Sequence, residues 1–341
     1  MKLEHIAAMS GSAARKGGIA LCAAAFCMAR AAFAGTVEFD VQGATATDPT
    51  AINAGGTITG AYKDTNFASH GFVRKRDGKI KSFDASAATD TLPNAISSKG
   101  TIAGTYTDAS FTFHGFVRTA HGAITSIDPS GSIGTEATCV NDKETVAGYF
   151  MDASGVTHGF QRAKDGAIAV FDPKHSTFTI ANAIDTRGTI AGYFISGVDG
   201  KYHGFLRSPA GKYKTFGVSG AIVTEANTLN ETKATAGVYA DGDGIYHAFA
   251  RSPTGTITTF DPTGAISSTA SSMNDGGTIA GDYVDSSHVE HGFMRAADGT
   301  ITSFDPTGST DTVAYGINNS DAVTGHWVDS NNTDHGYVRT P

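Results

Sequence analysis

The sequence predicts an all-β protein, a seven-bladed β-propeller, and three observations carry that prediction. A His-Gly-Phe triplet with close variants recurs at a spacing of about 44 residues, a period typical of propeller blades. Each repeat contains four short segments with the composition of β-strands, separated by turn sequences. The first and last repeats are incomplete in complementary ways. Together these features indicate a ring of four-stranded sheets.

The repeat is marked at four positions that keep one register. The triplet begins at His70, His114, His158, His203, His247, His291 and His335. A second marker, mostly Phe-Asp, begins at Phe39, Phe83, Ile127, Phe171, Phe216, Phe260 and Phe304. An aromatic residue that follows a glycine recurs at Tyr62, Tyr106, Phe150, Phe194, Tyr239, Tyr283 and Trp327. An asparagine recurs at Asn53, Asn141, Asn230, Asn274 and Asn318, with Ser97 and Asp185 in the two remaining repeats.

The sixth repeat illustrates the predicted strands. Residues 269–274 form the first strand, residues 278–283 the second, the segment from His291 the third, and residues 300–305 the fourth. Asp298-Gly299 between the last two predicts a two-residue hairpin, because glycine tolerates positive φ. Short hairpins join antiparallel neighbours and exclude a parallel β-helix, whose strands need crossover connections.

The two ends of the domain complete one another. Residues 36–40 resemble a fourth strand without its first three, and residues 335–341 resemble a third strand without its fourth. Pairing of these two segments would finish the last blade and leave no free strand edge, which would otherwise invite aggregation. We therefore expect the N-terminal strand to close the ring.

Residues 1–34 are expected to be a secretory signal peptide. They combine a basic start (Lys2, Arg15, Lys16), an apolar run and the small residues of Ala32-Phe33-Ala34 before the predicted cleavage site. The apolar run is shorter than the ~20 residues that span a bilayer, and an uncleaved interfacial anchor is the alternative. We predict a bacterial protein exported to the periplasm or the extracellular space, with residues 35–341 as a monomeric propeller that has no membrane span.

Charge and cysteine content narrow the partners and the chemistry. The formal net charge of −8 argues against nucleic acid, whose phosphates need a basic surface. Only Cys139 remains after residue 34, so no internal disulfide can form, and we expect a buried structural thiol.

We expect the repeated histidines and arginines to be structural. In six repeats an aspartate at the end of the second strand precedes the histidine by one loop, as Asp64 precedes His70, so that a contact across the hairpin would satisfy both groups. The repeated arginines would pair with carboxylates or carbonyls. A repeated ligand site and a metal or catalytic role are the alternatives.

Function is expected where the repeats differ, at the face where the chain enters the first strand and leaves the second. The candidate ligand-binding residues there are Asp48, Glu136, Glu225, Tyr315, His326 and Trp327. An acidic mouth with aromatic neighbours would suit a sugar or a cation, and drift among solvated loops is the alternative. Asp241-Gly242-Asp243-Gly244 resembles part of a calcium loop without its ligand spacing, so we predict a turn there, no metal ligands and no cofactor, with calcium as the one ion considered. No catalytic motif is present, and we assign no catalytic residue.

The repeat resembles that of bacterial secreted proteins of the HAF repeat family. The literal triplet is His247-Ala248-Phe249, and the pattern from Gly277 to Tyr283, followed by the triplet, Asp-Gly and Phe-Asp, is also similar. The resemblance covers the whole mature chain and implies an extracellular repeat protein without an established activity. Gly217 departs from the pattern where aspartate is usual.

These observations favour a binding or scaffold module over an enzyme. The leading ligand is an extracellular carbohydrate or another component of the cell envelope. The alternatives are a hydrolase or lyase that cleaves a polysaccharide or lactone at the channel mouth, and a protein-interaction platform.

Overall fold

The computed structural model describes residues 35–341, and the regular elements over that range are 28 β-strands. The predicted all-β propeller fold is confirmed. No helix capable of crossing a membrane occurs over this range. The signal peptide predicted for residues 1–34 lies outside the described residues.

The strands follow one another in a repeating order from the axis outward. The strands nearest the axis are β2 (Ala46–Ile52), β6 (Ala88–Ile96), β10 (Ser132–Val140), β14 (Ser176–Ile184), β18 (Val223–Leu229), β22 (Ala265–Met273) and β26 (Asp311–Ile317). The second strands are β3 (Ile58–Lys63), β7 (Ile102–Asp108), β11 (Val146–Asp152), β15 (Ile190–Ser196), β19 (Thr235–Ala240), β23 (Ile279–Asp285) and β27 (Val323–Val328). The third strands are β4 (Ser69–Arg74), β8 (Phe113–Arg118), β12 (Thr157–Arg162), β16 (Tyr202–Arg207), β20 (Tyr246–Arg251), β24 (Glu290–Arg295) and β28 (Asp334–Thr340). The outer strands are β5 (Ile80–Phe83), β9 (Ile124–Ile127), β13 (Ile168–Phe171), β17 (Tyr213–Phe216), β21 (Ile257–Phe260), β25 (Ile301–Phe304) and β1 (Gly35–Phe39).

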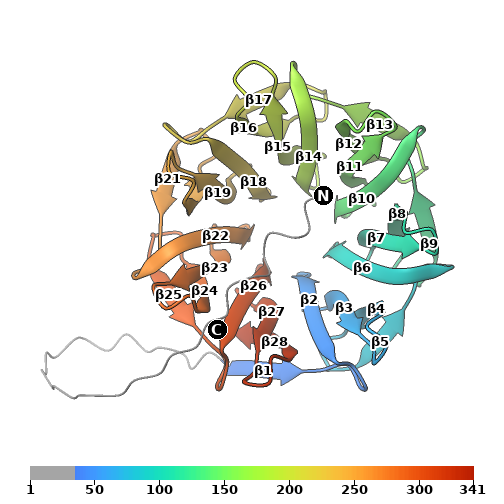
Figure 1. Cartoon of the computed structure of the whole chain (residues 1–341), viewed down its shortest axis with the longest axis vertical. Helices are drawn as coiled ribbons and strands as arrows, with labels where there is room; N and C mark the ends of the chain where they lie inside the picture. Colours follow the sequence, from blue (N-terminus) through green and yellow to red (C-terminus); the bar gives the residue numbers. More distant parts are fainter. Residues whose placement is uncertain (1–34) are drawn as a thin grey trace, which may run out of the picture.

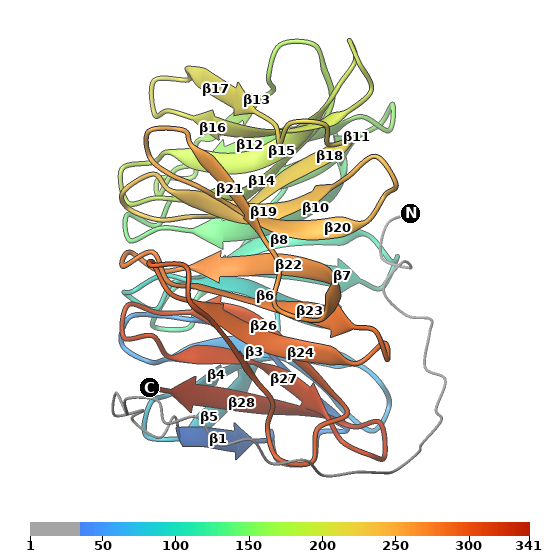
Figure 2. The same cartoon turned by 90° about the vertical axis from the view of Figure 1, so that its left-hand side faces the viewer.

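The strands form four-stranded antiparallel units, here called blades, and the blades surround a central axis (Figure 1). Six blades contain four consecutive strands, and the seventh contains β26–β28 and β1. Blade 1 contains β2–β5, and the others follow in chain order. Seen from the side, the blades stack one against the next, and their strands run roughly from one face of the ring to the other (Figure 2). A single parallel bridge, Thr157 to Phe178, links blades 3 and 4 into one eight-stranded sheet.

Blade 7 combines the two ends of the described chain. Strand β1 pairs antiparallel with β28, with Val37 opposite Val338, next to β27 and β26. Asn318 at the end of β26 donates its amide hydrogen to the carbonyl oxygen of Asn53 in blade 1, at 3.1 Å. Blades 7 and 1 are therefore joined by a side-chain hydrogen bond of the kind that joins blades 5 and 6, where Asn230 donates to Asn274.

The hairpins between third and outer strands have three-residue loops rather than the predicted two. In blade 1, Lys75 and Lys79 form the closing pair, and Gly78 donates its N–H to the Lys75 carbonyl at 2.9 Å. Gly78 has φ +88°. A turn followed by a left-handed glycine bulge matches the strand twist and accounts for this loop. The glycine prediction holds, and the loop length was wrong by one residue.

A bulge in every first strand explains the repeated glycine of the second strand. The register of β10 against β11 shifts between Ala137 and Cys139, and all the other first strands shift at the equivalent point. The bulge brings the first-strand backbone so close that a Cβ on Gly148 would overlap the Glu136 carbonyl oxygen. Only glycine fits opposite such a bulge.

The predicted histidine–aspartate contact is confirmed in all six repeats for which we proposed it, at 3.4–3.7 Å from Nε2. The structure adds a second carboxylate, because Nδ1 in these blades lies 2.7–3.1 Å from the aspartate of the Phe-Asp or Ile-Asp marker. Burial lowers the pKa of His158, but Asp172 and Asp152 outweigh it and raise that pKa above its usual range. In blade 4, Gly217 stands where the other blades have the second aspartate, and Asp199 of the β15–β16 loop contacts Nε2 of His203 at 3.0 Å, in place of the first aspartate.

The repeated arginines and phenylalanines hold neighbouring blades together. Phe116 is fully buried and meets Phe83 of the preceding blade edge to face, at 6.2 Å between ring centroids. The Arg118 guanidinium lies over the same Phe83 ring at 4.5 Å, and Nη1 donates to the Thr119 carbonyl. Carbonyl partners were among those predicted for the arginines, whereas stacking on the previous blade was not. Such contacts combine apolar burial with cation–π attraction.

Candidate binding site at the channel mouth

The site begins with one bulge residue on each first strand. The bulge aims its side chain at the axis. These seven positions are Thr50, Asn94, Thr138, Asn182, Asn227, Ser271 and Tyr315. The first five donate a hydrogen bond to a backbone carbonyl of the following blade, at 2.6–3.2 Å. This belt ties blades 1 to 6 together and fixes the wall of the channel.

The belt residues of blades 6 and 7 do not repeat this hydrogen bond to the following blade. The Ser271 hydroxyl turns back to Asp282 in its own blade, with 3.4 Å between the oxygens. Tyr315 in blade 7 is 39% exposed, and its ring lies 5.6 Å from that of His326. The belt of hydrogen bonds therefore has a break at blades 6 and 7, and titratable side chains gather beside it.

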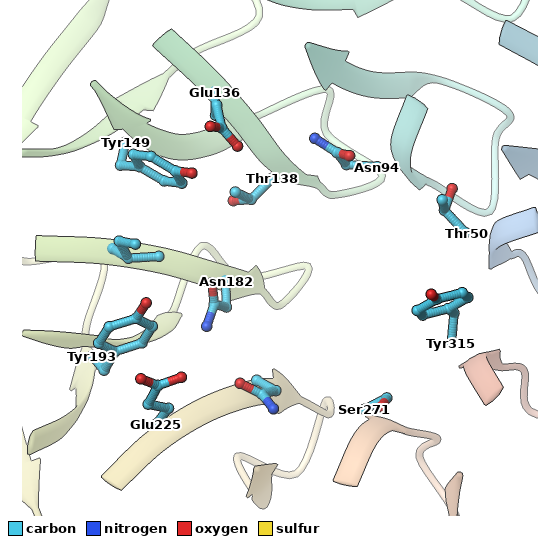
Figure 3. Close-up of a pocket in the computed structure, with 12 residues that line it drawn as sticks. Thr50, Asn94, Glu136, Thr138, Tyr149, Asn182, Tyr193, Glu225, Ser271 and Tyr315 are labelled. Carbon is cyan, nitrogen blue, oxygen red and sulfur yellow. The ribbon is translucent and has the colours of Figure 1, made fainter. Parts of the chain in front are cut away.

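A cavity of about 510 Å³ opens at this level of the channel. All seven belt residues line it. The rest of its wall consists of Glu136, Tyr149, Ile180, Tyr193 and Glu225. Glu136 and Tyr149 are directly opposite in the β10–β11 pair, and Ile180 is opposite Tyr193 in the β14–β15 pair. Figure 3 shows Tyr149 and Tyr193 on one side of the opening, with Tyr315 across from them. Carboxylates, amides, hydroxyls and aromatic rings thus share one open cavity.

Burial raises the pKa values of the carboxyl and phenol groups in this wall. It raises the pKa of Glu136, and a hydrogen bond from the Tyr149 hydroxyl partly offsets the shift. Burial, followed by the charge of Glu136, raises the pKa of Tyr149, and burial with the charge of Glu225 raises that of Tyr193. Both phenols therefore keep their protons at neutral pH and can donate hydrogen bonds.

A second group of acids lies beside the break in the belt. Asp282 and Glu290 share a side-chain hydrogen bond, and His326 Nδ1 lies 3.5 Å from Asp48. Burial, then the Glu290 charge, raises the pKa of Asp282 well above its usual range. Two adjacent carboxyl groups that cannot both ionise easily hold one proton between them. This pair can donate as well as accept a proton.

Asp282→Asn tests this arrangement through stability. Because the folded state raises the pKa of Asp282, ionisation of this group costs stability as pH rises above its unfolded value near 3.8. The neutral amide removes that cost, so the variant should gain about 1 kcal/mol relative to the natural protein between pH 4.5 and pH 8. Urea unfolding at both pH values measures the change.

Asp298→Asn is the control, because a backbone hydrogen bond from Thr300 lowers the pKa of that aspartate. Since Asp298 is ionised in both the folded and the unfolded protein above pH 4.5, the stability of Asp298→Asn relative to the natural protein should stay constant between pH 4.5 and pH 8. A pH-independent difference for Asp282→Asn would contradict the shared proton.

The structure brings most of the predicted residues to this region. Glu136, Glu225 and Tyr315 line the cavity, and Asp48 lies 3.5 Å from His326, whose ring is next to that of Tyr315. Trp327 lies elsewhere. It is 8% exposed and stacks on His335 at 4.7 Å, as the equivalent aromatic residue does in the other blades.

Sequence reasoning missed Tyr149, Tyr193 and Asp282. Each stands one residue before the repeated aromatic of the second strand, opposite the first-strand position that Glu136 occupies in blade 3. The sequence did contain a signal for these positions. Neighbouring residues of a strand face opposite sides of the sheet, so the residue before the buried repeated aromatic must face the other side.

The predicted turn at Asp241-Gly242-Asp243-Gly244 is confirmed. The Asp241 carboxylate accepts hydrogen bonds from the N–H groups of Asp243 and Ile245, at 2.9 and 3.0 Å. Across residues 35–341, no cluster of three or more histidine, cysteine, aspartate or glutamate side chains is arranged to hold a metal ion. Cys139 is buried as expected, which raises the pKa of its thiol to about 12.

No protein-family model and no curated protein sequence matches the chain. Solved propellers do match its fold. The β-propeller domain of the Trilobed protease from Pyrococcus furiosus, described as having an open velcro topology, gives a TM-score of 0.58 at 8% identity over 86% of this chain and 95% of that one. BP39L lectin from Burkholderia pseudomallei gives 0.57 at 9% over 87% and 98%. Acylaminoacyl peptidase from Pyrococcus horikoshii gives 0.54 at 8% over 87% and 52%. At such identities the likeness shows the propeller fold and nothing of the function.

Proposed function

We propose that this protein is a secreted bacterial propeller of the HAF repeat type that binds carbohydrate at the channel mouth. Sugars present neighbouring hydroxyls, which carboxylate and amide groups bind in pairs, and apolar ring faces, which pack on aromatic side chains. The cavity of about 510 Å³ supplies both kinds of group. It falls within the range of small-molecule sites, about 300–1,000 Å³.

One observation carries the proposal: Tyr149, Tyr193 and Glu136 converge on one cavity from blades 3 and 4, with Glu225 beside them on blade 5. The hydrogen bond from Tyr149 fixes the orientation of Glu136, and the belt fixes the backbone beneath them. A rigid polar wall loses little entropy when it binds a ligand. The lectin among the similar propellers adds that the fold can serve a sugar-binding protein.

Calorimetric titration with a panel of neutral oligosaccharides tests the proposal. We expect a stoichiometry near one, and Glu136→Gln and Glu225→Gln should each weaken binding about tenfold, since each loses a charged hydrogen-bond acceptor. Glu144→Gln is the matched control, because Glu144 in the β10–β11 turn pairs with Lys164 in the β12–β13 turn, outside the cavity. A stoichiometry near seven would move the site to the repeated elements. No binding at all would favour a protein-interaction platform instead.

A second function is supported by the Asp282–Glu290 pair. A carboxyl group whose pKa is raised by burial and by a neighbouring acid can act as a general acid in glycoside or lactone cleavage. We propose a hydrolase or lyase as the alternative, and turnover of bound polysaccharide that is lost in Asp282→Asn would favour it over a binding protein.

We also propose that β1 closes a seven-bladed ring in solution and that the protein is a monomer. The β1–β28 pairing and the Asn318–Asn53 hydrogen bond support closure. A closed ring leaves no strand edge open to another molecule.

A further inference from the structure

A second cavity lies between blades 1 and 2, on the face opposite the mouth. It has a volume of about 440 Å³ and is bordered by the turns that join β2 to β3, β4 to β5, β6 to β7 and β8 to β9. In an antiparallel blade these turns lie at the other end of the strands from the mouth. The cavity is therefore separate from the proposed sugar site.

The inner wall of this cavity combines an apolar surface with a buried cation. Val73 and Ile96 supply the apolar part. Arg118 is 7% exposed, Nη1 makes one long hydrogen bond of 3.4 Å to the Thr119 carbonyl, and Nε has no partner. Within residues 35–341, Arg118 takes part in no ion pair, and burial without a compensating acid lowers its pKa. A buried cation without a counter-ion is unfavourable, and an anion placed beside it would be stabilised.

The rim adds further positive charge. Lys75 and Arg76 line the opening, and both are exposed. Asp77, the one acidic residue of the lining, lies 3.4 Å from Lys79, which already matches its charge. A concave site lined by positive charges focuses the electrostatic potential and attracts an anion. This occurs on a chain with a net charge of −8.

The same molecule contains a comparison site between blades 5 and 6. That cavity of about 260 Å³ has Ala250 in place of Val73, Ser252 in place of Lys75 and Met273 in place of Ile96. Arg295 takes the place of Arg118. Both cavities therefore contain the pocket and the repeated arginine. Lysine and arginine at the rim are found in the cavity between blades 1 and 2, whereas the cavity between blades 5 and 6 has Ser252 at the position of Lys75.

We propose that the cavity between blades 1 and 2 binds an oxyanion carried on a sugar, the carboxylate of a uronate or a sulfate ester. Arg118 would pair with the oxyanion, since guanidinium groups are weakly hydrated and bind planar or tetrahedral oxyanions through several N–H groups. Val73 and Ile96 would pack on the apolar face of the sugar ring. The proposal goes beyond the mouth site and does not depend on it.

Titration with D-glucuronate, D-glucose 6-sulfate, D-glucose and sodium sulfate tests this site. We expect the two acidic sugars to bind more tightly than glucose, with an affinity that falls as salt rises. The double variant Lys75→Gln/Arg76→Gln should weaken their binding about tenfold, the effect of losing charge-assisted contacts. These exposed residues can change without disturbing the core, and Arg118→Lys then tests the buried group, with circular dichroism as the check on folding.

The control is Lys212→Gln/Lys214→Gln, which removes the same charge from the equivalent hairpin of blade 4. Equal losses in the two double variants, or equal affinities for glucose and the acidic sugars, would overturn the proposal. Sodium sulfate that binds as tightly as the sugars would reduce the site to an adventitious ion only. The tighter of the two acidic sugars identifies the oxyanion. Loss of acidic-sugar binding in Glu136→Gln, with no loss in Lys75→Gln/Arg76→Gln, would place that binding at the mouth and overturn the proposal.

Discussion

Gly148→Ala is expected to lower the free energy of unfolding by about 3 kcal/mol, the upper range for forcing atoms into a packed interior. A Cβ at this position would overlap the Glu136 carbonyl oxygen and stand 3.0 Å from the Ala137 Cα. Both are backbone atoms on a strand fixed by its pairing and by the Thr138 belt hydrogen bond. No side-chain rotation can relieve the overlap, so the bulge or the pairing must give way.

Gly134→Ala is the matched control in the same blade. Gly134 lies on β10 with no atom near the position of an added Cβ. Urea unfolding of both variants should show a large loss for Gly148→Ala and a change within about 0.5 kcal/mol for Gly134→Ala. Similar losses in both would mean that glycine contributes here through the unfolded chain, and the close approach of the two strands would not be its reason.

The propeller could be predicted from the sequence because its blade is repeated. His158, Phe160 and Asp172 make the same contacts in blade 3 as their equivalents make in other blades. These residues therefore recur in the sequence at a fixed period. The repeated asparagine is explained in the same way. Asn141 accepts N–H groups from Lys143 and Thr145 and donates to the next blade at Asp185, and no smaller side chain can do all three.

The first strands were harder to place. In the sixth repeat the first strand begins at Ala265, four residues before the predicted start, and a bulge at Ser271 separates its two halves. A bulge breaks the alternation from which a strand is recognised. The belt residues sit at these bulges, which is why Tyr315 is the only one of them that was predicted.

The candidate site could be predicted only in part. Glu136, Glu225 and Tyr315 stood out because they differ from their equivalents in other blades, and they line the cavity. Trp327 also stood out, but a tryptophan at a position where every blade has an aromatic is a larger version of the same packing residue. A departure from the repeat indicates a site only where the repeated position itself faces the cavity.

Phe39→Ala is the sharpest test of ring closure, with an expected loss of about 3 kcal/mol in the free energy of unfolding, as for other packed phenylalanines. Phe39 on β1 meets Phe72 of blade 1 at 6.1 Å and 76°, and Arg74 covers its ring at 4.5 Å. Removing the ring leaves a cavity beside a fully buried side chain and takes the aromatic partner from a buried arginine.

The internal blades supply the reference for this loss. Phe83 meets Phe116 at 6.2 Å and 77°, and Arg118 covers it at 4.5 Å, so Phe83→Ala removes the same contacts from a blade whose four strands are continuous in sequence. If β1 is paired with β28 as firmly as β5 with β4, the two variants lose equal stability in urea unfolding. If β1 detaches readily, the natural protein already lacks much of this packing, and Phe39→Ala changes little while Phe83→Ala remains costly. The ratio of the two losses therefore measures how fully the N-terminal strand closes the ring, independently of how much a phenylalanine at such a position contributes.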